Sequence, residues 1–407
     1  MRRRDPLAEG TVALAMEMGI AVIELVPSDA EAGWFTLKWP EGLAVPPTPL
    51  AAAMKGGRGE VCLVLHTSGT TSKPKIVPLT HENLCVGALC IASTLRLAPS
   101  DICLNVMPLF HIHGLSINLL ATLLSGAAVL ASPGFDPASF LAWLGVEQSS
   151  PTWYSAVPTM HLKVLRAAQE SQRSTGAPPS HTLQFIRNCS AALLPSTSVE
   201  LESLFGLVVM PTYAMTESMP IASNPRGEGR KLRSVGYSGG PHACLYVPLL
   251  DTNGEEAGFR PCVGEEEGEV CVRGKNVTAG YELRAHMCED PNKAAFYVRP
   301  ESGDRWLRTG DKGWVDSDGH LSLSGRFKEI ISRGAEKISP FAIEDMLRGH
   351  AAVHDIVAFS VPHEELGEVV GVAVVRCCLH CRRSNPQEPA RPAGQHRGLL
   401  RTPAHAI

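Results

Sequence analysis

Short apolar runs that alternate with helical patterns constrain the fold of this chain more than any other feature. Residues 61–65, 102–107, 127–130 and 207–210 form such runs, and polar or turn-forming residues bound them. Runs of this length are typical of strands buried inside a sheet, and helical patterns stand between several of them. The succession predicts an α/β fold with a substantial parallel sheet.

The sequence changes character after about residue 235, where glycine, proline and acidic turns become dense. Short alternating runs at 270–272 and 321–323 predict strands of a β-rich subdomain attached to the α/β part. A helical pattern at 341–347 and strand patterns at 356–361 and 369–375 predict a small α+β domain beyond it.

These patterns divide the chain into three regions. We expect a large domain at 1–325, a partial and mobile C-terminal domain at 326–376, and a disordered tail at 377–407. The tail is rich in proline and arginine and has no hydrophobic periodicity, which is typical of unfolded segments. Its cysteines and histidine at 377–381 lack the second ligand pair of a zinc site.

Composition excludes several classes of protein. The 407 residues contain 37 Lys and Arg against 41 Asp and Glu, a net charge of -4, which argues against a nucleic-acid-binding protein. Polar residues interrupt the most apolar stretch, 115–131, which is too short to span a bilayer. The 12 cysteines are scattered, mostly in apolar runs, so we expect them buried and reduced in a cytoplasmic protein. The last three residues, 405–407, are not a peroxisomal signal.

The strongest local signal is a run of small, hydroxyl-bearing and basic residues directly after the first predicted strand. It reads His66-Thr67-Ser68-Gly69-Thr70-Thr71-Ser72-Lys73-Pro74-Lys75. Hydroxyl and backbone donors around a glycine, together with a lysine, suit a polyphosphate. The alternative is a flexible surface loop. The order of a Walker A loop is absent, which disfavours a P-loop kinase or ATPase.

Residues 67–75 resemble the phosphate loop of the adenylate-forming superfamily, which includes acyl-CoA synthetases, luciferases and peptide-synthetase adenylation domains. Further motifs follow in the family's order: an acyl-pocket motif at 107–114, an adenylate motif at 213–217, a ribose motif at 308–311 and a hinge at 325–331. Within the superfamily, segments 71–74, 110–114, 189–191 and 334–340 look most like the oxalate–CoA ligase branch.

The resemblance implies an ATP-dependent acid–CoA ligase. A carboxylate would attack the α-phosphorus of ATP to give an acyl-adenylate and pyrophosphate, and the thiol of coenzyme A would then displace AMP. Substrates and cofactors would be a small carboxylic acid, ATP, Mg²⁺ and coenzyme A. The family would also allow a peroxisomal location.

Each role implied by the resemblance falls on particular residues of this chain. The ATP-binding residues would be Thr67, Ser68, Gly69, Thr70, Thr71, Ser72, Lys73, Lys75, Tyr213, Thr216, Asp311 and Arg326. The catalytic residues would be Lys75, Thr216, Glu217 and His111, with Glu217 holding Mg²⁺. His111 and Ser190 would contact the acid, Lys328 would be the hinge, and Gly334 would contact coenzyme A.

Several of these residues also have ordinary structural explanations. Asp311 follows a glycine, as turn residues often do, and Tyr213 alone suits a core. Glu217 alone suits the start of a helix. His111 and His113 have the spacing of a metal pair but lack partners, so packing or gating of the acyl pocket is the expected role.

The chain departs from the family pattern in ways that affect function. Pro220 stands where the oxalate branch usually has a histidine for the second carboxylate, which predicts weaker binding of a dicarboxylate. Ile76 replaces a glycine, which predicts a strained loop. No lysine follows Lys337, although the family's late lysine assists adenylation, and the N-terminal part of the large domain is expected to be missing. The alternative function is therefore a catalytically impaired relative that binds ATP without full turnover.

Overall fold

A computed structural model of the chain describes residues 6–19, 22, 24–27, 35–38, 57–67, 74–145, 150–238, 242–250, 256–283, 290–299, 302–333, 336–348, 350, 352–363 and 366–376. They fall into two compact units, 1–57 and 58–407. In the first unit, helix α1 (Pro6–Glu17) precedes an antiparallel pair of strands, β1 (Glu24–Pro27) and β2 (Phe35–Lys38). The predicted boundaries at 325/326 and 376/377 remain predictions, and the tail lies outside the described residues.

A seven-stranded sheet with the order β11–β10–β9–β8–β7–β5–β6 is the largest sheet of the second unit. Strands β5 to β9 run parallel to one another, whereas β10 and β11 are antiparallel to their neighbours. This arrangement confirms the predicted α/β class. The strands are β5 (Ile102–Asn105), β6 (Ala128–Ala131), β7 (Trp153–Ala156), β8 (Phe185–Asn188), β9 (Val208–Met215), β10 (Ser218–Ser223) and β11 (Tyr237–Ser238).

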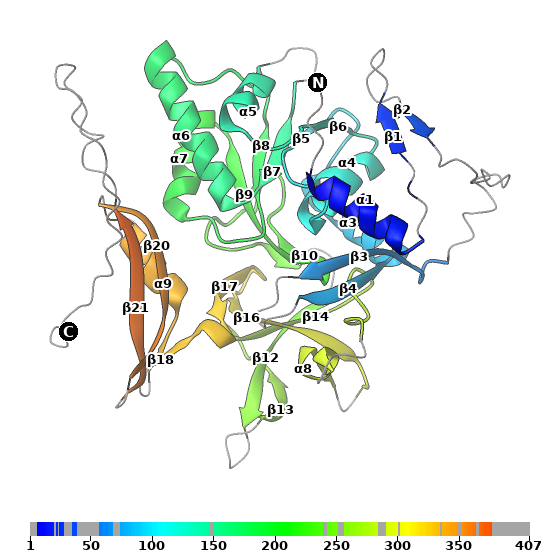
Figure 1. Ribbon diagram of the computed structural model, residues 1–407. Coiled ribbons are helices and arrows are strands. Elements are labelled where there is room, and N and C mark those ends of the chain that lie inside the picture. The colour runs from blue at the N-terminus through cyan, green and yellow to red at the C-terminus, as the bar shows by residue number, and fades with distance from the viewer. Residues whose placement is uncertain are drawn as a thin grey trace. The chain divides into compact units, whose positions relative to one another are not determined.

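Helices cover both faces of this sheet (Figure 1). One face carries α5 (Pro137–Leu144), α6 (Pro158–Thr175) and α7 (Pro195–Phe205). The other carries α3 (His81–Leu95), the π-helix η1 (His113–Leu120) and α4 (Ala121–Leu124). Neighbouring residues of β7 point to opposite faces, so Trp153 joins the core under α3 while Tyr154 joins the core under α5 to α7. Burial on both faces explains why the strands read as continuous apolar runs.

A second, antiparallel sheet has the order β13–β12–β14–β16–β15, with β17 paired to β16. It contains both runs that the sequence predicts for a β-rich subdomain, one in β14 and one in β17. Its elements are β12 (His242–Leu250), β13 (Glu256–Pro261), β14 (Gly268–Arg273), α8 (Pro291–Ala295), β15 (Phe296–Val298), β16 (Arg305–Val315) and β17 (Leu321–Arg326).

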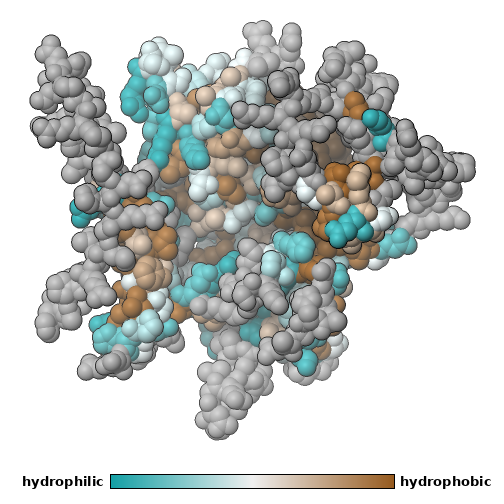
Figure 2. Space-filling view, in the orientation of Figure 1, coloured by the Kyte–Doolittle hydropathy of each residue, from teal (hydrophilic) through white to brown (hydrophobic). Residues whose placement is uncertain are grey.

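The last elements form a four-stranded sheet with the order β19–β18–β21–β20 and one helix. They are η3 (Phe327–Glu329), β18 (Ile331–Arg333), β19 (Glu336–Ile338), α9 (Pro340–Arg348), β20 (Val353–His363) and β21 (Gly367–Arg376). Strand β20 is apolar on both faces: Ile356 and Ala358 are buried, whereas Val357 and Phe359 are exposed. Hydrophobic surface is accordingly visible over this hairpin in Figure 2.

The segment around the predicted phosphate loop differs from the expectation of a single buried strand before that loop. Strand β3 (Val61–Thr67) pairs with a second strand, β4 (Lys75–Thr80), in an antiparallel sheet of two strands. No residue of β3 is fully buried, and Val61 and Val64 are exposed, whereas Ile76, Val77 and Leu79 of β4 are buried. Ile76 is buried in the extended backbone of β4, so the expected strain from its side chain is wrong.

The cysteines only partly follow the prediction of burial. Among the described residues, Cys103, Cys189 and Cys271 are buried, whereas Cys62 and Cys85 are exposed. The exposed pair lies on β3 and on the outer surface of α3, where the apolar pattern does not face a core. Across the described part of the chain, every helix is too short or too polar to cross a membrane.

The buried His161 makes the fold sensitive to acid. Its Nδ1 atom lies 3.1 Å from the Tyr154 hydroxyl, and burial lowers the pKa of His161 to about 4. Because this pKa is below the value of about 6.5 in an unfolded chain, stability is full above pH 6.5 and is lost as pH falls toward 4.

We expect His161→Asn to remove part of this pH dependence. The wild-type free energy of unfolding should fall by on the order of 3 kcal/mol from pH 7 to pH 4 through this group, and the variant should lack that component. Urea unfolding at both pH values measures it, with exposed His350→Asn as control. An unchanged pH dependence in His161→Asn would contradict the assignment.

Candidate functional site

Tyr213, Asp311 and Arg326, all predicted ATP-binding residues, meet in one hydrogen-bonded group. The Tyr213 hydroxyl donates to Asp311 Oδ2, and Arg326 Nε donates to Asp311 Oδ1 over 2.8 Å. Asp311 and Tyr213 are buried, and burial together with the Asp311 carboxylate raises the pKa of Tyr213. The residues come from β9, β16 and the end of β17, which pairs with β16 so that Asp311 faces Arg326. Segments about a hundred residues apart in sequence thus form one polar group.

A second ion pair supports the backbone beside Asp311. Buried Glu269 accepts hydrogen bonds from Arg308 Nε over 2.9 Å and from the Gly310 amide over 3.0 Å. The Thr309 hydroxyl accepts from the Asp311 amide over 3.1 Å. Gly310 has a φ of 76°, which glycine adopts without strain. The ribose motif at 308–311 is therefore fixed by its own strand as well as by Tyr213.

Glu217 lies in the turn between β9 and β10 rather than at the start of a helix. Its buried carboxylate accepts a hydrogen bond from the Tyr281 hydroxyl, with 2.6 Å between Oε1 and the phenol oxygen. Burial, followed by the Glu217 charge, raises the pKa of Tyr281. The Lys75 ammonium lies 4.4 Å from the centre of the Tyr281 ring, so Tyr281 contacts two of the four residues that were predicted to be catalytic, Lys75 and Glu217.

The acyl-pocket motif places two histidines differently. His113, at the start of η1, is fully buried between two serines: its Nδ1 lies 3.0 Å from Ser190 Oγ and its Nε2 lies 2.7 Å from Ser155 Oγ. His111 is exposed, and its Nδ1 accepts a hydrogen bond from the His113 amide over 3.1 Å. Ser190 is exposed and has a φ of 71°. The predicted acid contacts His111 and Ser190 are thus linked through His113.

Close packing explains the glycine in this motif. A Cβ atom on Gly114 would lie 2.4 Å from the Pro108 carbonyl oxygen, so only glycine lets η1 approach the preceding loop. A small cavity of about 10 Å³ separates this motif from the adenylate motif, with Ile112 and Ser116 on one side and Thr216 on the other. The predicted catalytic Thr216 therefore lies next to the acyl-pocket motif.

Some predicted site residues have no described environment. Ser68, Gly69, Thr70, Thr71, Ser72 and Lys73 of the phosphate loop lie outside the described residues, as does Gly334. Thr67 and Lys75, which flank the loop, are cross-strand partners in β3 and β4. Lys328 lies in η3, directly after β17.

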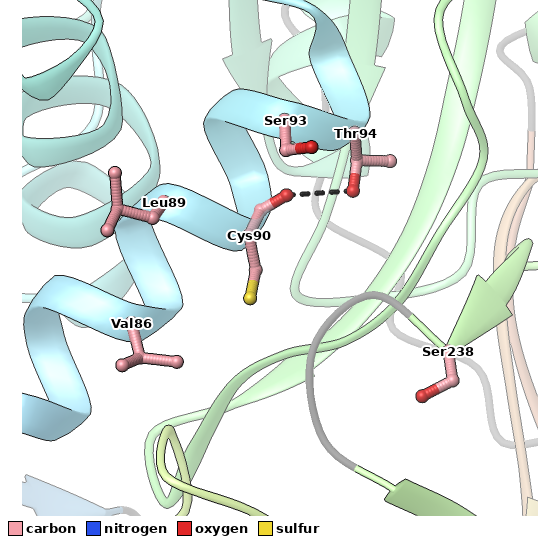
Figure 3. Close-up of a pocket in the computed structure, with 6 residues that line it drawn as sticks. All are labelled: Val86, Leu89, Cys90, Ser93, Thr94 and Ser238. Atoms are coloured by element: carbon pink, nitrogen blue, oxygen red, sulfur yellow. Dashed lines mark hydrogen bonds between the residues drawn. The ribbon is translucent and has the colours of Figure 1, made fainter.

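A cleft in the described part of the chain is lined by residues outside the predicted site. It holds about 360 Å³ and is lined by Val86, Leu89, Cys90, Ser93 and Thr94 of α3 and by Ser238 of β11 (Figure 3). Its polar groups are hydroxyls and one thiol, and Thr94 Oγ1 donates to the Cys90 carbonyl within the helix. Nothing in this lining supplies charge for a phosphate or a carboxylate.

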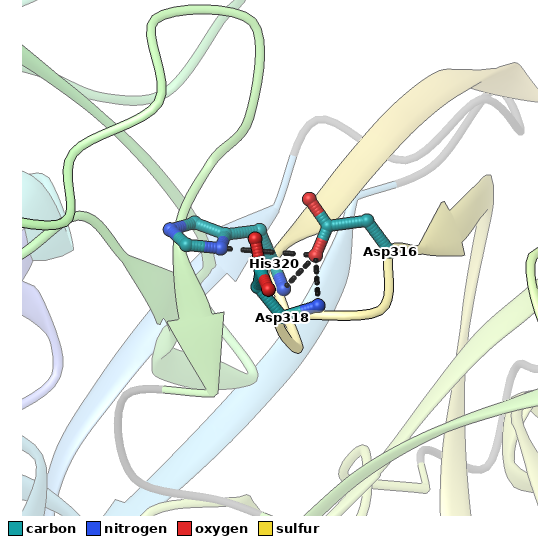
Figure 4. A group of neighbouring side chains, drawn as sticks. All are labelled: Asp316, Asp318 and His320. Atoms are coloured by element: carbon teal, nitrogen blue, oxygen red, sulfur yellow. Dashed lines mark hydrogen bonds and ion pairs between the residues drawn. The ribbon is translucent and has the colours of Figure 1, made fainter.

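A cluster of Asp316, Asp318 and His320 in the turn after β16 has the atoms of a metal site (Figure 4). Lys231, however, places its ammonium 2.6 Å from Asp316 Oδ2 and 2.7 Å from Asp318 Oδ2. The hydrogen bond from Lys231 lowers the pKa of Asp316 to about 2. The cluster is therefore an ion pair that closes the turn.

Sequence reasoning missed two residues of this region, Tyr281 and Arg187. Tyr281 is 64 residues from its partner Glu217, and no motif spacing marks it. Arg187 is different, since it is a charged residue of the short strand β8 (Phe185–Asn188) and is fully buried. A charged residue directly after the apolar pair Phe185 and Ile186 is a signal that the sequence contains.

Known proteins are similar to this chain over most of its length. The sequence pattern of a family described as AMP-binding enzyme matches residues 20–282. A probable CoA ligase, CCL9, from Humulus lupulus is 40% identical over 84% of this chain and 62% of its own length. An oxalate–CoA ligase from Arabidopsis thaliana is 42% identical over 77% of this chain and 57% of its own. The chain thus spans less than two thirds of the length of these relatives.

Two solved structures have folds similar to that of this chain. The ATP-bound MatB from Rhodopseudomonas palustris superposes with a TM-score of 0.72 and 28% identity, covering 92% of this chain and 68% of that chain. The o-succinylbenzoate–CoA synthetase MenE from Bacillus subtilis, in complex with ATP and magnesium ion, has a TM-score of 0.64 and 27% identity. It covers 79% of this chain and 61% of that chain.

Replacing Lys231 tests the interpretation of the acidic turn. Lys231→Met leaves Asp316 and Asp318 without their shared cation, so we expect a lower Tm at pH 7. Millimolar Ca²⁺ should raise the Tm of this variant more than that of the wild type, because the carboxylates then accept a cation. Lys163→Met on the exposed face of α6 is the control. An equal response to Ca²⁺ in wild type and variant would contradict the interpretation.

Proposed function

Because the chain belongs to the AMP-binding enzyme family, we propose that it joins a small carboxylic acid to coenzyme A at the expense of ATP, through an acyl-adenylate. The observation that carries the proposal is the hydrogen-bonded group of buried Tyr213 and Asp311 with Arg326, close in sequence and structure to Glu217. It supplies an aromatic surface, an acceptor for ribose hydroxyls and a cation within one site. The relatives named oxalate–CoA ligase support a short dicarboxylate as the acid.

The nucleotide would bind against Tyr213 and Asp311. The ring of Tyr213 offers a flat surface to adenine, while its hydroxyl and Arg326 hold the Asp311 carboxylate in one orientation. Ribose hydroxyls would then donate to an acceptor that is already positioned, which reduces the ordering cost of binding.

Glu217 fits Mg²⁺ by its chemistry. It is a buried carboxylate that is oriented by one phenol, and Mg²⁺ commonly binds one or two carboxylates together with substrate phosphates. When bound, the ion would neutralise phosphate charge. Lys75 over the Tyr281 ring adds a second positive charge on the same side, and Thr216 lies next in sequence to Glu217.

The acid would bind at His111 and Ser190, beside the acyl-pocket motif. Pro220 lies buried in β10, and its carbonyl accepts a hydrogen bond from Asn276, so this position offers structure and no charge. We keep Lys328 as the hinge and Gly334 as the coenzyme A contact, by resemblance.

The direct test measures pyrophosphate release and acyl-CoA formation with oxalate, malonate, succinate and acetate. We expect both products with at least one dicarboxylate, and AMP rather than ADP as the nucleotide product. Binding of ATP without pyrophosphate release on any acid would contradict the proposal. Adding preformed acyl-adenylate separates a defect in the first half-reaction from one in the second.

The ribose contact can be tested with two matched variants. Asp311→Asn removes a buried charged acceptor, so the KM for ATP should rise roughly ten- to a hundredfold. Asp318 is an exposed residue of the same type in the turn after β16, and Asp318→Asn should leave the KM for ATP unchanged. Equal effects of the two variants on the KM for ATP would exclude the proposed contact.

Tyr281→Phe tests whether the phenol orients Glu217. Loss of the hydrogen bond leaves the Glu217 carboxylate free to rotate, so the concentration of Mg²⁺ at half-maximal rate should rise several-fold. The ring beneath Lys75 is retained in this variant. An unchanged Mg²⁺ dependence would show that Tyr281 does not position the carboxylate.

A further inference from the structure

Arg187 is a fully buried cation without a hydrogen-bonded partner in the described part of the chain. All three of its guanidinium nitrogens are buried, and none makes a hydrogen bond there. Its strand neighbours Phe185 and Cys189 belong to the apolar core under α3. Burying an unpaired cation is costly for a fold, and a hydrophobic residue of similar size is generally preferred at such a position. Packing alone therefore does not explain this residue.

The surroundings of Arg187 connect it to the acyl pocket. Arg187 on β8 is the register partner of Ser155 on β7, and in parallel strands such partners share a face. Ser155 Oγ lies 2.7 Å from His113 Nε2, and His113 Nδ1 lies 3.0 Å from Ser190 Oγ. From the buried cation to the exposed hydroxyl, the groups therefore lie in the order Arg187, Ser155, His113 and Ser190.

The charge of His113 depends on this environment. Burial is the largest effect that lowers the pKa of His113, and the Arg187 charge is the next, with smaller effects from His111 and His161. The imidazole is therefore neutral and carries one N–H. Because each ring nitrogen contacts a serine hydroxyl, the hydrogen bonds run in one direction along the chain of three residues.

Only one of the two directions suits an anionic substrate. When Ser155 donates to Nε2 and the Nδ1–H donates to Ser190, the Ser190 hydroxyl retains its own hydrogen for a carboxylate. In the opposite direction Ser190 donates to His113 and faces the pocket as an acceptor, which repels an anion.

We propose that Arg187 is a specificity-determining positioning residue, the buried cation that lets the pocket accept an acid with a second anionic group. Arg187 acts through His113 and Ser190. It supplies a positive charge, whereas Pro220, at the position of the histidine of the oxalate branch, supplies none. This inference rests on the proposed acid–CoA ligase function. The electric field of the Arg187 guanidinium is strong in the apolar core. The guanidinium therefore attracts an anion at Ser190 across the neutral His113.

Stability and specificity should then respond in opposite ways. In Arg187→Met, removal of an unpaired buried charge should leave Tm unchanged or raise it. The KM for oxalate should rise at least about tenfold, whereas the KM for the monoanion acetate should change by less than about threefold. Arg187→Lys, which keeps the charge, should recover part of the affinity for oxalate. Arg173→Met, at the exposed end of α6, is the control for net charge.

The experiment measures KM and kcat for oxalate and acetate, together with Tm, for these three variants of the full chain. Equal losses on both acids with a lower Tm, or no change on either acid, would overturn the proposal. Calorimetric binding of oxalate in the presence of α,β-methylene ATP separates the two hypotheses. Oxalate binding that depends on Arg187 without any turnover contradicts the ligase function alone. Turnover of oxalate that is unaffected by Arg187→Met contradicts the specificity role alone.

Discussion

The carboxylate of Asp311 is a buried charge that joins the two large sheets of the second unit. It accepts from Tyr213, at the end of a strand of the seven-stranded sheet, and from Arg326, at the end of the antiparallel sheet. Tyr213 lies just before the turn that carries Glu217, and Arg326 lies directly before η3. The position of both backbone segments matters for the site. A shift of either sheet would break a hydrogen bond to a buried charge, so the two sheets are held in one relative position.

Three buried charges near the site are treated differently by the fold. Asp311 has two donors, Glu217 has the Tyr281 phenol, and Arg187 has no hydrogen bond among the described residues. The two acids are thereby oriented for partners that would approach from outside. The cation is oriented by packing, and its influence extends through space. Each charge costs stability on folding, and the extent of pairing sets how much of this cost is offset within the chain.

Much of the fold could be predicted from the sequence because burial on both faces gives continuous apolar strands. The runs ending at Leu130 and Met210 lie in or at strands of the parallel sheet, and the later strands at Val270 and Leu321 are also found. Strand β4 was missed, because its apolar residues alternate with a proline and a threonine in a sheet of two strands. Propensity carries little information when a short strand has a single partner strand.

The site could be predicted where a motif keeps its residues together in sequence. Tyr213 lies in β9, and Thr216 and Glu217 lie in the turn that follows it, while Asp311, predicted for the same site, is hydrogen-bonded to Tyr213 and Arg326. Tyr281 could not be predicted, since its role arises from a contact between distant segments. His113 was not among the predicted site residues, yet it makes both serine contacts, because η1 turns it inward and leaves His111 exposed.

The pairing of β3 with β4 has a consequence for how this segment can vary in evolution. Thr67 and Lys75 are opposite one another, so the strands hold both ends of the intervening loop at a fixed separation. A single-residue insertion within either strand would shift the register and turn Lys75 to the opposite face, away from Tyr281. Changes of length are tolerable between the paired ends alone, so the register of β3 and β4 restricts where this segment can gain or lose residues.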